Sequence, residues 1–94
     1  MNYLVLIYDY KNVLELRLKY RSNHLLDTKE LILKGNIINA GAILENNKMI
    51  GSSLIVDFNS IDNLNDWLYN DPYTKGKVWN LETLQIIPLK LLDK

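Results

Sequence analysis

The sequence predicts an α+β fold in which two helical segments cover one face of a four-stranded antiparallel sheet. Short apolar runs rich in branched and aromatic residues alternate with amphipathic segments whose apolar residues recur every three to four positions. Their order along the chain is strand, helix, strand, strand, helix, strand, and a polar turn joins the two central strands. This order is that of a ferredoxin-like βαββαβ sandwich.

The composition limits the number of domains and the classes of partner. The chain has 94 residues, 48% of them hydrophobic, so we expect one domain over residues 1–94. Eleven basic residues balance eleven acidic ones, which argues against nucleic acid or an anionic membrane as a partner. The chain has no cysteine and one histidine, so we expect neither thiolate chemistry nor a metal centre built on sulfur or on several histidines.

The first strand is predicted at residues 2–9, a short run of apolar and aromatic side chains. This run lacks a basic leader and is far shorter than the roughly 20 residues of a membrane span. We therefore expect a cytoplasmic protein.

The first helical segment is predicted in two pieces. Asn12 has the position of a capping-box residue at the start of the first piece, and the polar stretch 20–23 interrupts it. Ser22 is the predicted N-cap of the second piece, and Gly35 its stop. His24 is therefore expected in the first turn of a helix.

The second and third strands are predicted at residues 37–43 and 52–58, joined as a hairpin through the polar residues 45–48. The strand at 37–43 completes the first half of the βαββαβ order, and the strand at 52–58 begins the second half.

A second helix is predicted after Ser60, with apolar residues of 61–68 at spacings of three and four. It must end at Asp71, because the proline that follows disfavours helical geometry in the residue before it. Residues 78–88 are the last predicted strand, and residues 89–94 form a tail.

Both faces of the predicted sheet are apolar. The segments 4–7, 54–56 and 86–87 carry apolar side chains at every position. In a sheet with one face exposed to solvent, apolar and polar side chains alternate along each strand. Two helices cover only one face, so we predict a homodimer in which the bare sheet faces meet about a twofold axis and enclose a barrel. A monomer covered by its tail is the alternative, but that tail is too short to shield four strands.

Several short elements occur in a specific order. They are Arg21-Ser22-Asn23-His24-Leu25, Gly35, Ala40-Gly41, Gly51-Ser52, Phe58, Trp67, Asp71-Pro72-Tyr73 and Pro88. In this order and spacing the chain resembles, over nearly its whole length, the YciI-like (YCII-related) family of small dimeric α+β barrel proteins. The connection LENNKMI at 44–50 departs from the family, because it is short and lacks a Gly/Pro-rich loop that many relatives carry. The shape of the substrate is therefore left open.

The resemblance implies that His24 and Asp71 meet in a pocket as a catalytic dyad. By the same matching, Arg21, Ser52 and Tyr73 fall at pocket positions and would bind a small-molecule ligand. One type of relative is a dehydrochlorinase of chlorinated hydroxyquinols, and most relatives have no assigned substrate. A homodimer with no cofactor is implied as well.

The predicted helix ends give a physical reason for this pairing. The positive end of a helix disfavours an imidazolium at His24, and the negative end of the next helix disfavours a carboxylate at Asp71. Contact between the two groups would relieve both effects and fix the imidazole tautomer. The alternatives are a helix-start histidine without a role, and an Asp71 that bonds to its own backbone in a turn.

Alternatives are also open for the other candidate residues. Arg21 either grips an anionic oxygen or forms a surface ion pair with Glu15 or Asp27. Ser52 either donates a hydrogen bond to a substrate or finishes a turn. Candidates for an aromatic pocket are Tyr8, Tyr10, Tyr73 and Trp79.

Two functions follow as hypotheses. The first is a cofactor-independent enzyme with lyase-like or isomerase-like chemistry, in which His24 moves the proton and Asp71 orients it. The second is a non-catalytic ligand-binding or accessory module with the same dimeric pocket. Only the enzyme should show a rate that depends on the titration of the histidine. A cofactor-free oxygenase is a third class, for which this pairing is not the expected signature.

Overall fold

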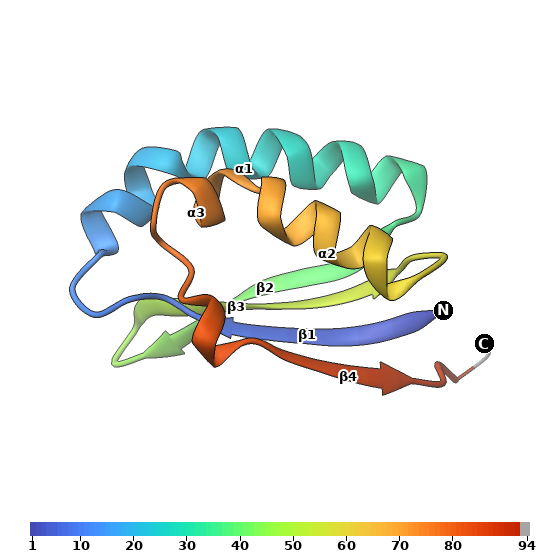
Figure 1. The fold of residues 1–94 in the computed structure, drawn as a ribbon. Coiled ribbons are helices and arrows are strands. Elements are labelled where there is room, and N and C mark those ends of the chain that lie inside the picture. The colour runs from blue at the N-terminus through green and yellow to red at the C-terminus, as the bar shows by residue number, and fades with distance from the viewer. Residues whose placement is uncertain (93–94) are drawn as a thin grey trace.

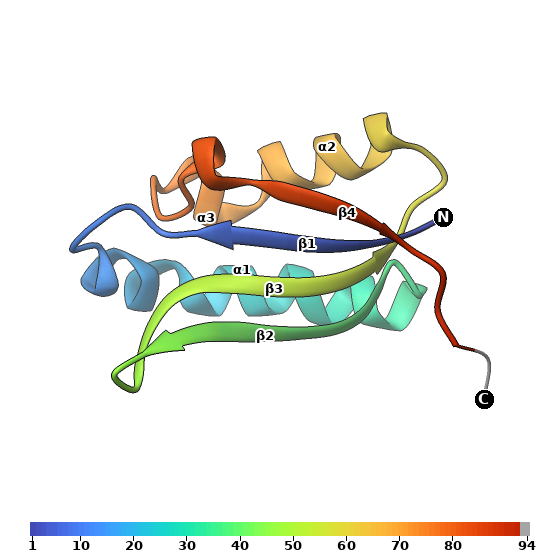
Figure 2. The same ribbon diagram turned by 90° about the horizontal axis from the view of Figure 1, so that it is seen from below.

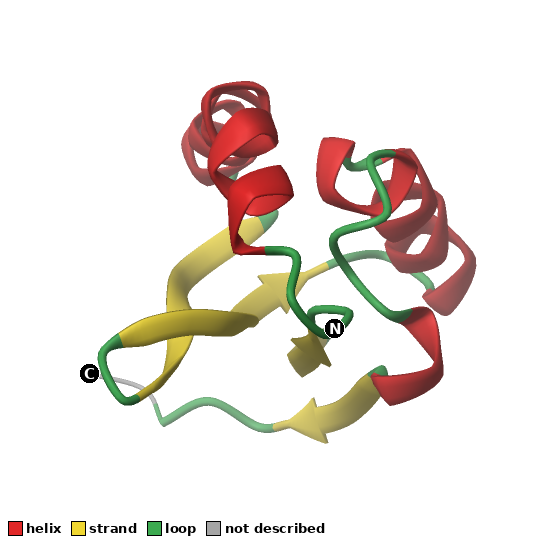
Figure 3. Ribbon diagram, turned by 90° about the vertical axis from the view of Figure 1, so that its left-hand side faces the viewer, coloured by secondary structure: helices red, strands yellow, loops and turns green. Residues whose placement is uncertain are grey.

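The computed structural model describes residues 1–92 and confirms the ferredoxin-like βαββαβ order (Figure 1). The elements are β1 (Asn2–Tyr8), α1 (Leu14–Lys34), β2 (Ile37–Glu45), β3 (Lys48–Asp57), α2 (Ile61–Asn70), α3 (Pro72–Lys75), the 3₁₀ turn η1 (Leu81–Thr83) and β4 (Gln85–Leu89). The four strands form one antiparallel sheet in the order β2-β3-β1-β4. Seen from one end, the helices form one layer and the strands the other (Figure 3).

The core lies between these two layers. Along β1 the alternation is strict, because Tyr3, Val5 and Ile7 are buried while the residues between them are partly exposed. Val5 pairs with Leu54 of β3, so buried side chains continue across the sheet. From above, α2 contributes Leu64, which is fully buried. Within residues 1–92, none of the helices combines the length and the apolar composition of a membrane span.

The prediction of two helical pieces is wrong, because α1 is one continuous helix of 21 residues. Its N-cap is Val13, which makes no side-chain cap hydrogen bond, and Asn12 adopts a left-handed φ of 60° instead. Ser22 lies within the helix on its exposed side and caps nothing. Contacts of α1 with the sheet outweigh the weak local preference of polar residues for a break. Gly35 ends the helix with φ 86°, as predicted.

The predicted hairpin between the second and third strands is present, with longer strands than expected. Glu45 pairs with Lys48, which leaves a turn of two residues. These are Asn46 and Asn47, with φ 51° and 64°, as a type I′ turn requires. In β3, Gly51 allows a close approach of β1, since a Cβ there would lie 2.6 Å from the carbonyl oxygen of Ile7.

The last strand is shorter than predicted. Residues 78–88 were expected to be extended throughout, but β4 comprises only Gln85–Leu89. Trp79 forms an isolated bridge with Asp9, and η1 then lies between that bridge and β4. Leu89, predicted as tail, ends the strand, and the chain from 90 to 92 forms no regular element. Residues 93–94 of the predicted tail lie outside the described residues.

The second face of the sheet carries no helix (Figure 2). The strand register places Leu4, Ile55 and Ile87 side by side across β1, β3 and β4 on this face. Leu4 and Ile55 are half-buried, and Ile87 is 39% exposed. We refer to these three residues as the open-face row.

Candidate active site

The lone histidine lies in the middle of α1, on the side that faces the sheet. The prediction that His24 occupies a first turn is wrong, so the positive helix end gives no account of its charge. The residues that α1 buries are Arg17, His24 and Thr28, spaced by seven and four positions. A helix that turns polar side chains toward a core needs partners for them. Those partners form the candidate site.

Asp71 stands between α2 and α3. It has an extended backbone, with φ −65° and ψ 140°, as the residue before a proline requires. Its carboxylate accepts a hydrogen bond from the backbone N–H of Tyr73 at 2.9 Å, so Asp71 is the N-cap of α3 as well as the C-cap of α2. The predicted position of Asp71 at the C-terminus of a helix is confirmed, and its N-cap role in α3, where a carboxylate is favourable, opposes the unfavourable effect of that helix end.

His24 and Asp71 are in direct contact. The imidazole Nδ1 lies 2.9 and 3.0 Å from the two carboxylate oxygens. The side chains of His24 and Asp71 are 9% and 1% exposed. A carboxylate can only accept a hydrogen bond, so Nδ1 carries the proton of the neutral ring. The Nδ1–H group donates a hydrogen bond to the carboxylate of Asp71. The other nitrogen, Nε2, keeps its lone pair and lies 3.5 Å from the hydroxyl of Thr28.

Two aromatic rings hold the imidazole in place. Tyr73 stacks on His24 with ring centroids 4.0 Å apart and an interplanar angle of 15°. Trp79 meets the same imidazole edge-on at 5.5 Å. Burial raises the pKa of Tyr73 above its usual 10.0, against the opposing charges of Arg17 and Arg21. Tyr73 is thus a neutral phenol near neutral pH.

A buried ion pair that the sequence patterns did not predict lies beside the dyad. Arg17 donates from Nη1 to both carboxylate oxygens of Asp9, at 2.8 and 3.0 Å, and from Nη2 to Ser52 at 2.9 Å. Its guanidinium carbon lies 4.8 Å from the ring centroid of Tyr73. Burial raises the pKa of Asp9 above 3.8, and the nearby Arg17 offsets part of that rise. The signal available in the sequence was the polar spacing of Arg17, His24 and Thr28 on one helix.

A cavity of about 200 Å³ lies between α1 and the strands β2 and β3. Arg21, His24, Ser52 and Tyr73 all line it, whereas Asp71 lies behind the imidazole. Ser52 is in the middle of β3 and is 4% exposed, so the prediction that it finishes a turn is wrong. Arg21 forms no ion pair with Glu15, Asp27 or any other described residue.

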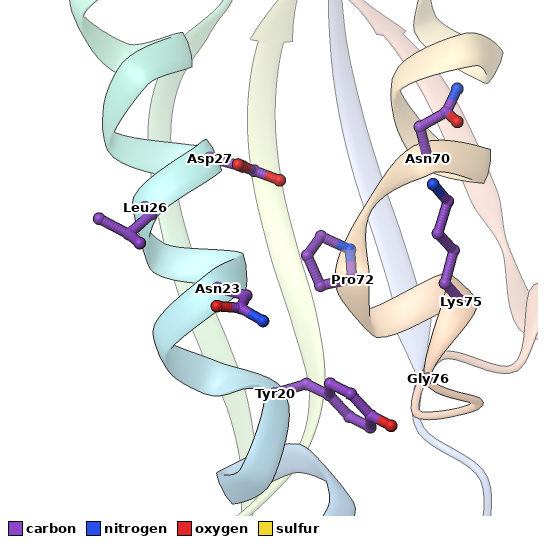
Figure 4. Close-up of a pocket in the computed structure, with 8 residues that line it drawn as sticks. All are labelled: Tyr20, Asn23, Leu26, Asp27, Asn70, Pro72, Lys75 and Gly76. Atoms are coloured by element: carbon purple, nitrogen blue, oxygen red, sulfur yellow. The ribbon is translucent and has the colours of Figure 1, made fainter.

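Other hollows do not contain the dyad. Tyr8 and Tyr10, expected beside Tyr73, line a separate hollow at the β2–β3 turn. Another, of about 510 Å³, lies between α1 and α3 (Figure 4). Its residues are Tyr20, Asn23, Leu26, Asp27, Asn70, Pro72, Lys75 and Gly76. Of these three hollows, the cavity of about 200 Å³ is the one that His24 lines.

The double role of Asp71 predicts a difference between two substitutions. Asp71→Asn keeps an oxygen that accepts from the N–H of Tyr73, whereas Asp71→Ala removes it. We expect Asp71→Ala to be less stable than Asp71→Asn by about 1 kcal/mol in urea unfolding. Equal unfolding free energies would contradict the capping role.

Within residues 1–92, no group of three or more His, Asp or Glu side chains is arranged to hold a metal ion. Residues 1–90 match the family model of the YCII-related domain. An uncharacterised protein of Haemophilus influenzae is 33% identical over 86 residues, which cover 84% of this chain and 88% of that protein.

A solved structure is also similar. It is 5-chloro-2-hydroxyhydroquinone dehydrochlorinase (TftG) of Burkholderia phenoliruptrix AC1100, in complex with 2,5-dihydroxybenzoquinone. The two structures superpose with a TM-score of 0.83 at 25% sequence identity, and the match covers 96% of this chain and 94% of the other.

Proposed function

Because this chain belongs to the YCII-related domain family, we propose that it is a cofactor-independent enzyme that moves a proton on a small molecule. The chemistry is lyase-like or isomerase-like, with His24 and Asp71 as the dyad. The observation that carries this proposal is the buried contact of Nδ1 with the carboxylate, in a histidine that lines a cavity. The likeness to a dehydrochlorinase that binds a small quinone supports it.

In this mechanism Nε2 of His24 acts as the general base. It takes a proton from an activated position of the substrate, and Asp71 stabilises the imidazolium through Nδ1–H. In an elimination the electron pair of the broken bond forms a double bond, and the leaving group departs with its own pair. In an isomerisation the imidazolium returns the proton to another atom. Proton transfer of this kind contributes about 10² to 10⁴ in rate.

A non-catalytic ligand-binding module is the rival function. It is favoured by the pairing of the carboxylates near the cavity, since Asp9 and Asp71 are both hydrogen-bonded to other side chains of the chain. Such a network also suits a rigid binding site. The two functions differ in turnover. The enzyme converts a substrate and loses that activity when His24 is replaced, whereas a binder shows no turnover.

We further propose that two copies of this chain form a homodimer through their open sheet faces. The open-face row is apolar, and the helices cover only the opposite face (Figure 2). A second copy would remove this row from water, with a free-energy gain of about 25 cal/mol per Å² of apolar area. The two sheets would then enclose a barrel-like interior.

Ile55→Asp tests the dimer. The substitution places a carboxylate in the centre of the open-face row, where dimerisation would bury it without a partner. We expect the variant to sediment as a monomer at concentrations where the native chain sediments as a dimer. Leu33→Asp is the matched control, because Leu33 is 88% exposed on α1, in the helix layer. A native chain that is monomeric at high concentration would contradict the proposal.

A further inference from the structure

The hydroxyl of Ser52 is surrounded by donors. Arg17 donates to its oxygen from Nη2 at 2.9 Å, and Trp79 donates from Nε1 at 3.1 Å. Neither a guanidinium nor an indole N–H can accept a hydrogen bond in return. A serine hydroxyl offers two acceptor positions and one donor. Both acceptor positions of Ser52 are therefore occupied.

The remaining O–H of Ser52 has no acceptor among the described residues. The hydrogen bonds of its side chain within residues 1–92 are the two that it accepts. Ser52 is only 4% exposed, so bulk water does not supply an acceptor freely. It lines the cavity that also holds His24. The unpaired donor is thus available to whatever enters that cavity.

The charges around the cavity favour an anion. Asp9 neutralises Arg17, and Asp71 faces His24. Arg21 lines the same cavity and forms no ion pair with any residue from 1 to 92, so it adds a positive charge. The cavity of about 200 Å³ is also small. An enclosed space of about 150 Å³ holds one benzene ring, so this cavity has room for about one ring.

We propose that Ser52 is a dedicated hydrogen-bond donor to an oxyanion of a single-ring ligand, and that Arg17 and Trp79 are the positioning residues that prevent it from accepting. This inference rests on the proposed function, because it names the ligand chemistry of the same cavity. When His24 removes the proton of a phenol, the electron pair stays on the phenolate oxygen. When it removes a proton from the carbon next to a ketone, that pair forms a C=C bond and the carbonyl pair moves onto oxygen. Ser52 would stabilise that oxygen.

The first test uses 4-nitrophenol as the probe, because its phenolate and phenol forms differ in absorbance. We expect the native protein to bind the phenolate more tightly than the phenol, so that the bound probe ionises at lower pH than the free probe. Ser52→Ala should weaken phenolate binding about 10- to 100-fold. Binding of 4-nitroanisole, which cannot ionise, should change little. Ser53→Ala is the matched control, since Ser53 is the next residue of β3 and its hydroxyl bonds to the carbonyl of Gly41 instead.

Trp79→Phe tests whether Trp79 positions the hydroxyl of Ser52 or only supports the fold. It keeps an aromatic ring but removes the N–H, so one acceptor position of Ser52 becomes free. The difference in affinity between phenolate and phenol should then become smaller, because the oxygen of Ser52 can also accept a hydrogen bond from the O–H of the phenol. If Trp79 had only a structural role, Trp79→Phe would weaken the binding of phenolate and phenol equally. That result would overturn the assignment of Trp79 as a positioning residue.

A further variant separates this inference from the proposed function. His24→Asn should lose turnover but keep a phenolate preference that depends on Ser52. A preference that survives Ser52→Ala, or a probe that does not bind at all up to its solubility limit, would overturn the inference. Neither outcome bears on whether His24 moves a proton.

Discussion

Replacing His24 with asparagine is expected to reduce turnover by about 10²- to 10⁴-fold, the contribution of a general base. The amide nitrogen of asparagine lies close to the position of Nδ1, so it can still donate to Asp71. What the variant lacks is Nε2, the nitrogen with the free lone pair. The loss should therefore appear in kcat, measured first with 5-chloro-2-hydroxyhydroquinone, the compound in the name of the structural relative.

The matched control for this experiment is Asn23→Ala. Asn23 is the preceding residue on the exposed side of α1 and does not line the cavity of His24. Its replacement should leave turnover within about twofold of the native rate, since surface changes away from such features have small effects. Native turnover in a folded, dimeric His24→Asn variant would reject the catalytic role of the dyad.

Removing the charge of Arg17 is expected to cause the largest loss of stability. Arg17→Met leaves the carboxylate of Asp9 buried without a partner, with its side chain 5% exposed. Breaking a buried pair in this way costs about 3–5 kcal/mol. For a domain of this size the midpoint of thermal unfolding should fall by at least about 12 °C. Calorimetry or circular dichroism measures the shift.

The loss of stability in Arg17→Met should be larger at neutral pH than at acidic pH. Burial raises the pKa of Asp9 in the folded state above 3.8, so ionisation of this group costs stability as the pH rises through that pKa. Without Arg17 the folded-state pKa of Asp9 rises further. The deficit of the variant relative to the native protein is then largest at neutral pH, and it shrinks as the pH falls and Asp9 takes up a proton in both.

Lys34→Met is the control for the pH experiment. Lys34 pairs with Glu30 at 3.0 Å, but the two side chains are 61% and 64% exposed. Exposed pairs contribute at most about 1 kcal/mol, and often much less. A deficit for Arg17→Met that is no larger than that of this control, or that does not vary with pH, would show that the Arg17–Asp9 pair is not buried in solution.

The sequence contained enough information for the fold. The apolar periods, the polar turn at Asn46-Asn47 and the stop at Gly35 act locally, and each of them predicted an element that the structure has. Continuity of α1 was not predictable in this way, because it depends on contacts between α1 and residues far along the chain. The shortened β4 has a similar cause, since Trp79 is held by its bridge to Asp9 and by its contacts with the rings of His24 and Tyr73.

The site was predictable only in part. The resemblance paired His24 with Asp71. The helix-end argument for that pairing was wrong for His24, which lies in mid-helix, whereas Asp71 does end α2 as predicted and is also the N-cap of α3. The buried ion pair of Arg17 and Asp9 was not predictable from the sequence, because charged residues on a helix or after a strand usually face water. Only the folded chain shows that Ser52 accepts from two donors at once.

The most direct test of the central claim is the tautomer of His24, measured by ¹⁵N nuclear magnetic resonance of the imidazole. With one histidine in the chain, the spectrum contains one imidazole to assign. We predict a ring protonated at Nδ1, with a downfield proton in a hydrogen bond to Asp71, and an Nε2 shift typical of an unprotonated nitrogen that accepts no more than a long hydrogen bond from Thr28. Asp71→Asn should abolish the downfield proton. A ring protonated at Nε2, or an average of both tautomers in fast exchange, would contradict the dyad.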